Sequence, residues 1–292
     1  MAGKKSIAQK LPWNDKAGRF SLLKTGTLVL VSLPMLWLLY RTLFIGLGAR
    51  PVVEATHRVG DWTVYLLLIT LAVTPSRRLF NLPKLILIRR ILGLSALAYI
   101  LVHFALFIVD SKLNLGFVAK EIVLRIYLTI GFVALLGMVA LGVTSTDGMI
   151  RRVGAIRWNR LHKLIYLSAF LGILHYYIQS KIDVSQPVIM TGFFFWLMGY
   201  RIMARYGYKD GLVPLFSLTI AAGLLTVGVE ALWYELMTGI GGKRVFLANF
   251  GFGFGVRPVV WVVGTAIVVI LVAELRRRFR PAPARTRQAA AA

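Results

Sequence analysis

Cysteine is absent from this 292-residue chain. A chain without thiols forms no disulfide, has no thiolate nucleophile, and cannot hold an iron–sulfur cluster or another metal through a thiolate. Redox chemistry in this chain would therefore depend on a bound cofactor. The absence leaves the compartment open, because a protein without cysteine suits either side of a membrane.

Acidic side chains are also scarce, with 11 Asp and Glu against 35 Lys and Arg, and the formal net charge is +24. So positive a chain could bind nucleic acid. The basic residues, however, lie in short segments between apolar runs and not on one compact domain. Such residues mark cytoplasmic loops and contacts with anionic lipid headgroups. We therefore expect membrane lipids as partners, and no nucleic acid.

Apolar residues are abundant, at 58% of the chain with a mean hydropathy of +0.74, and the excess lies in long blocks. Runs of about 18 or more apolar residues are typical of membrane spans. The sequence predicts an all-α, polytopic membrane bundle. Eight spans are expected, at 27–45, 62–75, 91–109, 123–144, 159–178, 187–203, 213–237 and 258–275. The second of them is short, and we expect it to extend upstream toward His57.

Lys and Arg are distributed unevenly between the two ends of these spans. If the N-terminus is cytoplasmic, 25 of the 35 basic residues fall on the inner side, as the positive-inside rule requires. We therefore expect both termini in the cytoplasm, with a basic segment at 1–26 followed by an uncleaved first span. The Arg-, Pro- and Ala-rich tail at 276–292 is expected to be disordered.

The chain has only four histidines. Three of them lie within expected spans, and two of these three lie at similar depths. Polar side chains in hydrocarbon usually face a cavity, a partner or a cofactor. His103 and His175 both fall in the outer half of the membrane, at levels about 6 Å apart. Neutral imidazole is a good axial ligand for haem iron, so the two could ligate one haem from opposite sides. The alternative is that each imidazole is satisfied by a backbone carbonyl or a hydroxyl.

His162 precedes His175 by 13 residues, so it lies about 20 Å lower and roughly 140° around an ideal helix. It could contact a second cofactor near the inner face. Alternatively, it could face lipid headgroups beside Arg160 and Lys163.

Glu230 and Glu235 lie near the outer end of the seventh expected span. They could line a proton or quinone path. The interpretation we favour is that they reach the interface or pair with an arginine.

Several ordered blocks of this sequence are specific enough to resemble a known family. They are LGARPVVEATHRVGDW (47–62), LITLAVTPSRR (68–78), RRILGLSALAYILVHF (89–104), YLTIGFVALLGMVALGVTST (127–146) and RVGAIRWNRLHKLIYLSAFLGILHYY (152–177). Over roughly residues 30–203 the chain resembles the haem-binding membrane subunit (MsrQ, also called YedZ) of the periplasmic methionine sulfoxide reductase system. That family belongs to the ferric-reductase-like transmembrane group.

The resemblance implies a six-helix haem-binding core at 27–205 in the bacterial inner membrane. The two additional spans expected at 206–275 depart from the family, and we recognise no resemblance over them. It implies one or two haems b, with His103, His175 and His162 as ligands and haem iron as the metal. His57 matches the histidine that precedes the second span, where hydrogen bonding or docking is as reasonable as ligation. FMN is also associated with the family, although no motif here places it.

The sequence departs from the wider group at one position of the haem pattern. That group carries two histidines per ligating helix, 13 or 14 residues apart, whereas counting back from His103 reaches Arg90 and Arg89. A guanidinium is a poor iron ligand but pairs well with a haem propionate or a phosphate. An inner haem on His162 would therefore lack a matching histidine.

Taken together, the residues and the resemblance favour an electron-transfer subunit. Electrons would arrive from quinol or a cytoplasmic flavin reductase and pass to a periplasmic molybdopterin-containing methionine sulfoxide reductase, with which the chain forms a heterodimer. The sulfoxide chemistry would belong to that partner. The alternatives are a self-contained ferric or cupric reductase, or a proton-coupled transporter that uses intramembrane His and Glu.

Overall fold

The computed structural model describes residues 11–15, 17–181, 183–208, 210–251 and 255–279. Within these ranges the chain is helical, with one isolated antiparallel bridge between Asn14 and Phe20 and no longer strand. The helices are α2 (Leu22–Tyr40), the π-helix η1 (Arg41–Ile45), α3 (Pro51–Leu79), the 3-10 helix η2 (Pro83–Ile88), α4 (Arg89–Asp110), α5 (Leu115–Leu124), α6 (Ile126–Val143), α7 (Asp147–Val153), α8 (Ala155–Leu161), α9 (Leu164–Ser180), α10 (Ser185–Arg205), α11 (Leu212–Thr238), α12 (Gly242–Ala248) and α13 (Pro258–Phe279).

Eight helical stretches of the described chain are long and apolar enough to cross a membrane, and they correspond to the eight predicted spans. The chain is therefore a multi-pass membrane protein with an all-α fold, as predicted. The first span begins at Leu22, inside the segment 1–26 that we expected to be cytoplasmic. The second begins at Pro51, because proline suits the first position of a helix. His57 consequently lies within the second turn of α3 and does not precede that helix.

The last span also extends further than expected. α13 continues through the three basic residues of its final turn to Phe279, where positive charge complements the helix dipole. Residues 276–279 are thus helical and not disordered. The rest of the predicted disordered tail, 280–292, lies outside the described residues.

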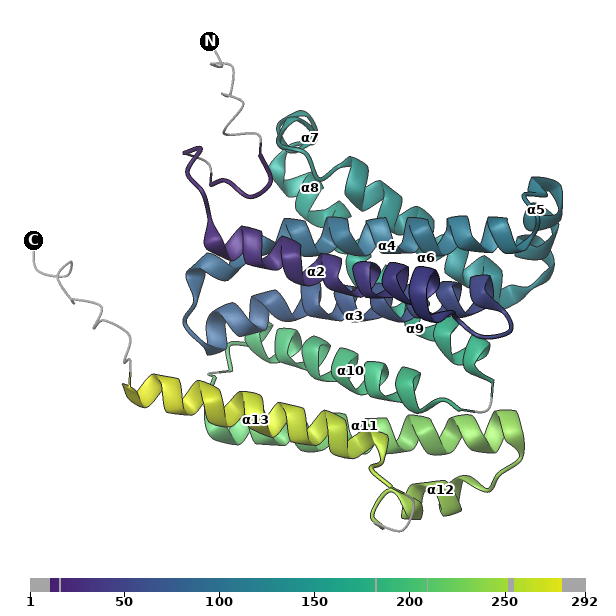
Figure 1. The fold of residues 1–292 in the computed structure, drawn as a ribbon. Helices are drawn as coiled ribbons and strands as arrows, with labels where there is room; N and C mark the ends of the chain where they lie inside the picture. Colours follow the sequence, from purple (N-terminus) through teal and green to yellow (C-terminus); the bar gives the residue numbers. More distant parts are fainter. Residues whose placement is uncertain (1–10, 16, 182, 209, 252–254, 280–292) are drawn as a thin grey trace, which may run out of the picture.

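The long helices lie side by side in one bundle (Figure 1). α3 packs most extensively on α4, and α6 packs most extensively on α9. α10 joins this core to α11 and α13, and α12 lies against α11. Figure 1 shows the start of α2 and the end of α13 at the same end of the bundle.

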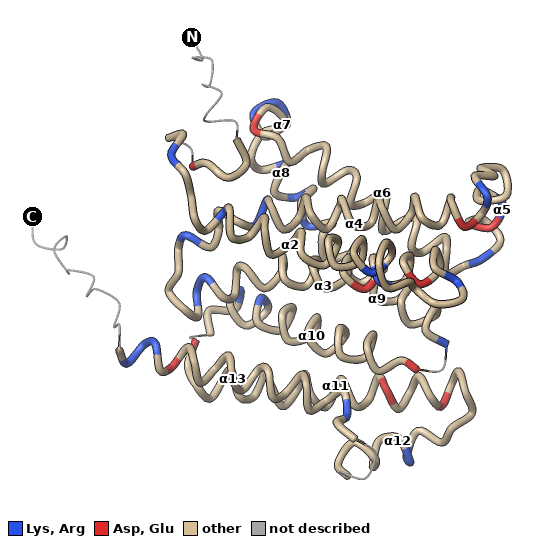
Figure 2. Tube along the Cα trace, in the orientation of Figure 1, with Lys and Arg blue, Asp and Glu red and all other residues tan. Residues whose placement is uncertain are grey.

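Charged residues differ between the two ends of the bundle (Figure 2). Lys and Arg gather at the end that carries α7, the start of α2 and the end of α13, whereas acidic and basic residues mix at the end that carries α5 and α12. This asymmetry is the pattern expected of a membrane protein whose basic end faces the cytoplasm.

Two prolines lie inside membrane-spanning helices, and in each case another helix satisfies backbone groups nearby. At Pro34 of α2, the buried Tyr99 hydroxyl donates to the carbonyl of Val31 at 2.7 Å and accepts from the amide of Met35 at 3.2 Å. Pro75 of α3 cannot donate to the carbonyl four residues earlier, at Leu71. The guanidinium of Arg201 in α10 donates to that carbonyl instead.

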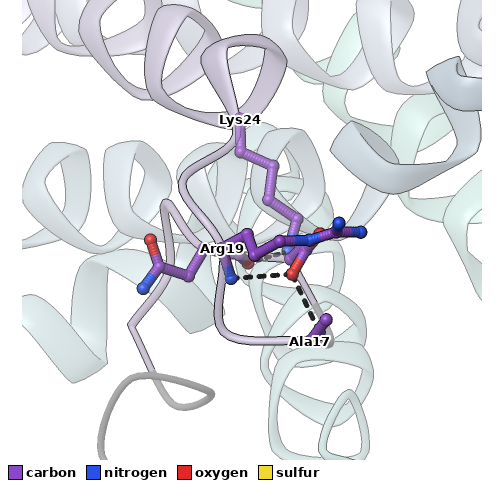
Figure 3. A network of polar contacts seen from close by, with 5 residues as sticks. Ala17, Arg19 and Lys24 are labelled. Carbon is purple, nitrogen blue, oxygen red and sulfur yellow. Dashed lines mark hydrogen bonds and ion pairs between the residues drawn. The ribbon is translucent and has the colours of Figure 1, made fainter.

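A compact turn precedes α2 (Figure 3). The Asp15 carboxylate accepts from the backbone amides of Ala17 at 2.8 Å and Arg19 at 2.9 Å, and Lys24 donates to the carbonyl of Asn14 at 2.7 Å. The Arg19 amide, followed by the Ala17 amide and the Arg19 guanidinium, holds the pKa of the Asp15 carboxyl below its usual value. The carboxylate therefore holds the turn at neutral pH, and its hydrogen bonds are lost only as the pH falls through that lowered pKa.

Candidate functional site

Two histidines from different helices face each other in the half of the bundle farther from its basic end. His103 lies on α4 and His175 on α9, 72 positions apart in the chain. Their ring centroids are 6.3 Å apart, and the ring planes meet at 85°. The structure therefore brings together the two residues that the depth argument paired from the sequence.

Each of these imidazoles is oriented by a carbonyl of a neighbouring helix. His103 Nδ1 lies 2.8 Å from the carbonyl oxygen of Thr56 in α3, and His175 Nδ1 lies 2.7 Å from that of Tyr127 in α6. A carbonyl only accepts, so both Nδ1 atoms must carry the proton. In the neutral imidazole this leaves Nε2 as the unprotonated nitrogen, available to coordinate a metal.

The histidine pair lies where two tightly packed pairs of helices meet. The Thr56–His103 bond lies within the α3–α4 pair, and the Tyr127–His175 bond lies within the α6–α9 pair. Contacts between these helix pairs are much sparser than contacts within them. A ligand held by both histidines would therefore bridge the two halves of the core.

His162 lies apart from this pair, toward the basic end of the bundle. It follows the last residue of α8, and the helix is interrupted at 162–163 before α9 starts at Leu164. Its ring stacks on Trp158 with centroids 3.8 Å apart, and its Nε2 lies 3.3 Å from the Thr144 hydroxyl. The interruption means that the ideal-helix angle between His162 and His175 does not apply.

The remaining candidate residues also lie outside the pair. His57 is exposed on α3, and its neighbour Arg58 forms an ion pair of 2.8 Å with Glu54. Arg90 forms an ion pair of 2.8 Å with Asp147, which ties the start of α4 to α7. Arg89, the preceding residue, is half-buried at the same end of α4.

The two glutamates of the extension have defined partners. Glu230 is buried, accepts from Arg257 at 2.8 Å and accepts from the amide nitrogen of Asn249 at 2.7 Å. Glu235 accepts from the backbone amide of Gly242. The favoured interpretation, pairing with an arginine, is therefore confirmed for Glu230.

Comparison with known proteins identifies the family. A protein of Rhodospirillum rubrum, named protein-methionine-sulfoxide reductase heme-binding subunit MsrQ, is 39% identical over 192 residues, which cover 65% of this chain and 89% of that relative. The chain belongs to the MsrQ family. Residues 59–173 also match the family described as ferric reductase like transmembrane component. This stretch contains His103 and ends just before His175.

Other MsrQ proteins agree with this assignment. The MsrQ protein of Herminiimonas arsenicoxydans is 41% identical over 174 residues, 59% of this chain and 80% of the relative. That of Caulobacter vibrioides is 36% identical over 170 residues, 58% of this chain and 81% of the relative. No solved structure matches the chain.

The donor set of the histidine pair suits haem iron, the cofactor that the names of these MsrQ relatives imply for those proteins. A metal-bound imidazole nitrogen lies about 2 Å from its metal, so two rings on opposite sides of one ion have centres roughly 6 Å apart. The observed 6.3 Å agrees with this spacing. The hydrogen bonds to Thr56 and Tyr127 are of the same kind as those that orient metal-bound histidines in other proteins.

Sequence reasoning missed the groups that surround the pair in this MsrQ chain. Thr56 and Tyr127 act through their backbone carbonyls, and a residue's type carries no signal for such a role. Phe104 and Phe132, with ring centroids 5.8 Å apart, link α4 to α6 near the pair. An aromatic residue within an apolar span resembles any other core residue, so periodicity alone could not single them out.

Proposed function

We propose that this chain binds haem b between α4 and α9, with His103 and His175 as axial ligands, and carries electrons across the bacterial inner membrane. The single observation behind the proposal is the histidine pair, in which both Nδ1 atoms are engaged by carbonyls and both Nε2 atoms are available. The names of the relatives, which are heme-binding subunits, support the same cofactor.

The proposed electron acceptor is a periplasmic, molybdopterin-containing methionine sulfoxide reductase that forms a heterodimer with this chain. Bound haem would supply a one-electron couple, and the sulfoxide chemistry would take place in the partner. The chain's own contribution is to hold and orient two imidazoles in the outer half of the membrane, facing that partner. Both imidazoles are half-buried among the apolar helices around them.

The proposed electron entry lies at the basic end of the bundle, which we place in the cytoplasm together with both termini. Quinol or a flavin reductase would donate there, and the Lys and Arg side chains would attract a phosphorylated donor or cofactor such as FMN. His162 and Arg89 lie toward this end. We assign them to a contact with that donor or with a second haem, separate from the His103–His175 pair.

The proposal is tested by haem content. The protein purified in detergent after expression with ample haem is expected to show a b-type reduced-minus-oxidised spectrum. His103→Ala and His175→Ala each remove one of two axial ligands, so each is expected to lose most of the bound haem. Haem per chain, measured as the pyridine haemochrome, decides the result.

Two further variants act as controls. His57→Ala removes an exposed histidine of α3 and should retain wild-type haem. His162→Ala should keep the spectrum of the His103–His175 haem, because its ring lies beyond the helix interruption. A wild-type protein without haem would contradict the proposal, as would full haem retention in either His103→Ala or His175→Ala.

A further inference from the structure

Each imidazole of the histidine pair lies against a glycine of the neighbouring helix. A Cβ atom added to Gly60 of α3 would lie 3.0 Å from both Cε1 and Nδ1 of His103. A Cβ added to Gly131 of α6 would lie 2.9 Å from Nδ1, 3.1 Å from Cε1 and 3.2 Å from Cγ of His175. These separations are shorter than a comfortable nonbonded contact, about 3.5–4.0 Å between carbon atoms.

The two glycines occupy the same place relative to the carbonyl that each histidine uses. In an α-helix the carbonyl of residue i points toward residue i+4. Gly60 follows Thr56 by four residues, and Gly131 follows Tyr127 by four residues. The missing Cβ therefore lies beside the hydrogen-bonded carbonyl in both cases, which leaves room for the ring to reach it.

We propose that Gly60 and Gly131 are positioning residues that hold the two histidine rings in the tautomer and orientation needed for iron ligation. The proposal rests on the proposed haem function. A methyl group at either glycine would push the imidazole away from the carbonyl and weaken its Nδ1 hydrogen bond. That bond makes the ligand more basic and fixes the ring, so its loss weakens metal binding about 10- to 100-fold.

The sign of the effect on reduction potential follows from the same bond. A more basic ligand favours ferric over ferrous iron, so weakening the Nδ1 bond should raise the potential of the haem. Each tenfold loss of ferric affinity relative to ferrous affinity raises a one-electron potential by about 59 mV. A purely structural defect would lower the yield of folded protein without shifting the potential in this direction.

The test compares Gly131→Ala and Gly60→Ala with Gly172→Ala in the full chain. Gly172 lies on α9, the helix of His175, and a Cβ there would meet no atom within 4 Å. All three changes favour helix formation equally, so they differ mainly in their contact with a histidine ring. Haem per chain, the redox titration midpoint and the EPR g-values of the oxidised protein are the readouts.

We expect Gly131→Ala to lose the most haem, because the added methyl would meet three ring atoms, and any haem that remains should have a raised midpoint and altered g-values. Gly60→Ala should retain more haem and still show a raised midpoint, which keeps the test decisive if Gly131→Ala folds poorly. Gly172→Ala should match the wild type.

If both Gly131→Ala and Gly60→Ala match the wild type in haem, midpoint and g-values, the positioning role is wrong while the proposed function stands. If the wild type lacks haem, the proposed function fails and the positioning role fails with it.

Discussion

At the scale of single residues, one hydroxyl accounts for how α2 accommodates a proline within the membrane. Backbone groups in hydrocarbon need a partner inside the protein. Tyr99, only 5% exposed, takes the place of a helical hydrogen bond by joining the Val31 carbonyl and the Met35 amide. The same contact fixes α2 against α4, the helix that carries His103.

Tyr99→Phe is therefore expected to destabilise the protein more than the loss of one surface hydroxyl would. The change leaves a buried carbonyl and a partly buried amide without their partner, and such a loss costs about 1–3 kcal/mol. Thermal unfolding in detergent measures the loss. Tyr206→Phe is the matched control, because Tyr206 is 75% exposed. Equal melting temperatures for the two variants would contradict the role assigned to Tyr99.

The histidine pair could be predicted at this scale, but its surroundings could not. His103 and His175 stand out because imidazole is rare in apolar spans and their depths can be counted along each helix. Their partners, Thr56 and Tyr127, contribute only backbone atoms. The angle between His162 and His175 was counted on an ideal helix, and the structure interrupts the helix at 162–163. No proline or glycine at these two positions signals that interruption.

At the scale of helices, a buried polar cluster holds the extension together in the half that lies away from the basic end. Glu230 of α11 bonds to Asn249, which follows α12, and to Arg257, which precedes α13. One side chain of α11 thus connects this helix to the end of α12 and to the start of α13. Trp233 lies one turn further along α11. Its ring centroid is 4.9 Å from that of Tyr177 on α9, so this aromatic contact connects the extension to the core.

Arg257→Met is expected to destabilise the extension strongly. It leaves the Glu230 carboxylate buried without its cation, and breaking such a pair costs about 3–5 kcal/mol. The double variant Glu230→Leu with Arg257→Met removes both charges and should recover most of that loss. Arg244→Met, on the exposed surface of α12, serves as the control. Thermal unfolding compares the four proteins, and a double variant as unstable as Arg257→Met would contradict the ion-pair explanation.

At the scale of the whole molecule, the charge difference between the two ends predicts orientation. The native chain has no cysteine, so single cysteines can report the side on which each end lies. The two positions to be tested are Lys84, between α3 and α4, and Lys243, in α12 at the opposite end. The variants are Lys84→Cys and Lys243→Cys. In cells with a permeabilised outer membrane, an impermeant maleimide should label only Lys243→Cys. Lys84→Cys should react once the inner membrane is opened, and the reverse pattern would overturn the orientation.

The number and order of the spans were predictable at this scale, because long apolar runs leave few other ways to place the membrane-spanning helices along the chain. Helix ends were less predictable. α2 includes the charged Lys24, and α13 includes three arginines, because helices continue into the interface where long basic side chains reach water. Two of the short helices, α7 and α12, carry no long apolar run and could not be recognised as elements.

The order of the helices along the chain also has a consequence in time. His103 lies in the third span and His175 in the fifth, and the carbonyls that orient them lie in the second and fourth. A protein is synthesised from its N-terminus, and its parts assemble in that order. Every group of the histidine pair is therefore present in the membrane before α10, α11 and α13 have been made. The extension is added to a bundle that already contains the complete histidine pair and both of its carbonyl partners.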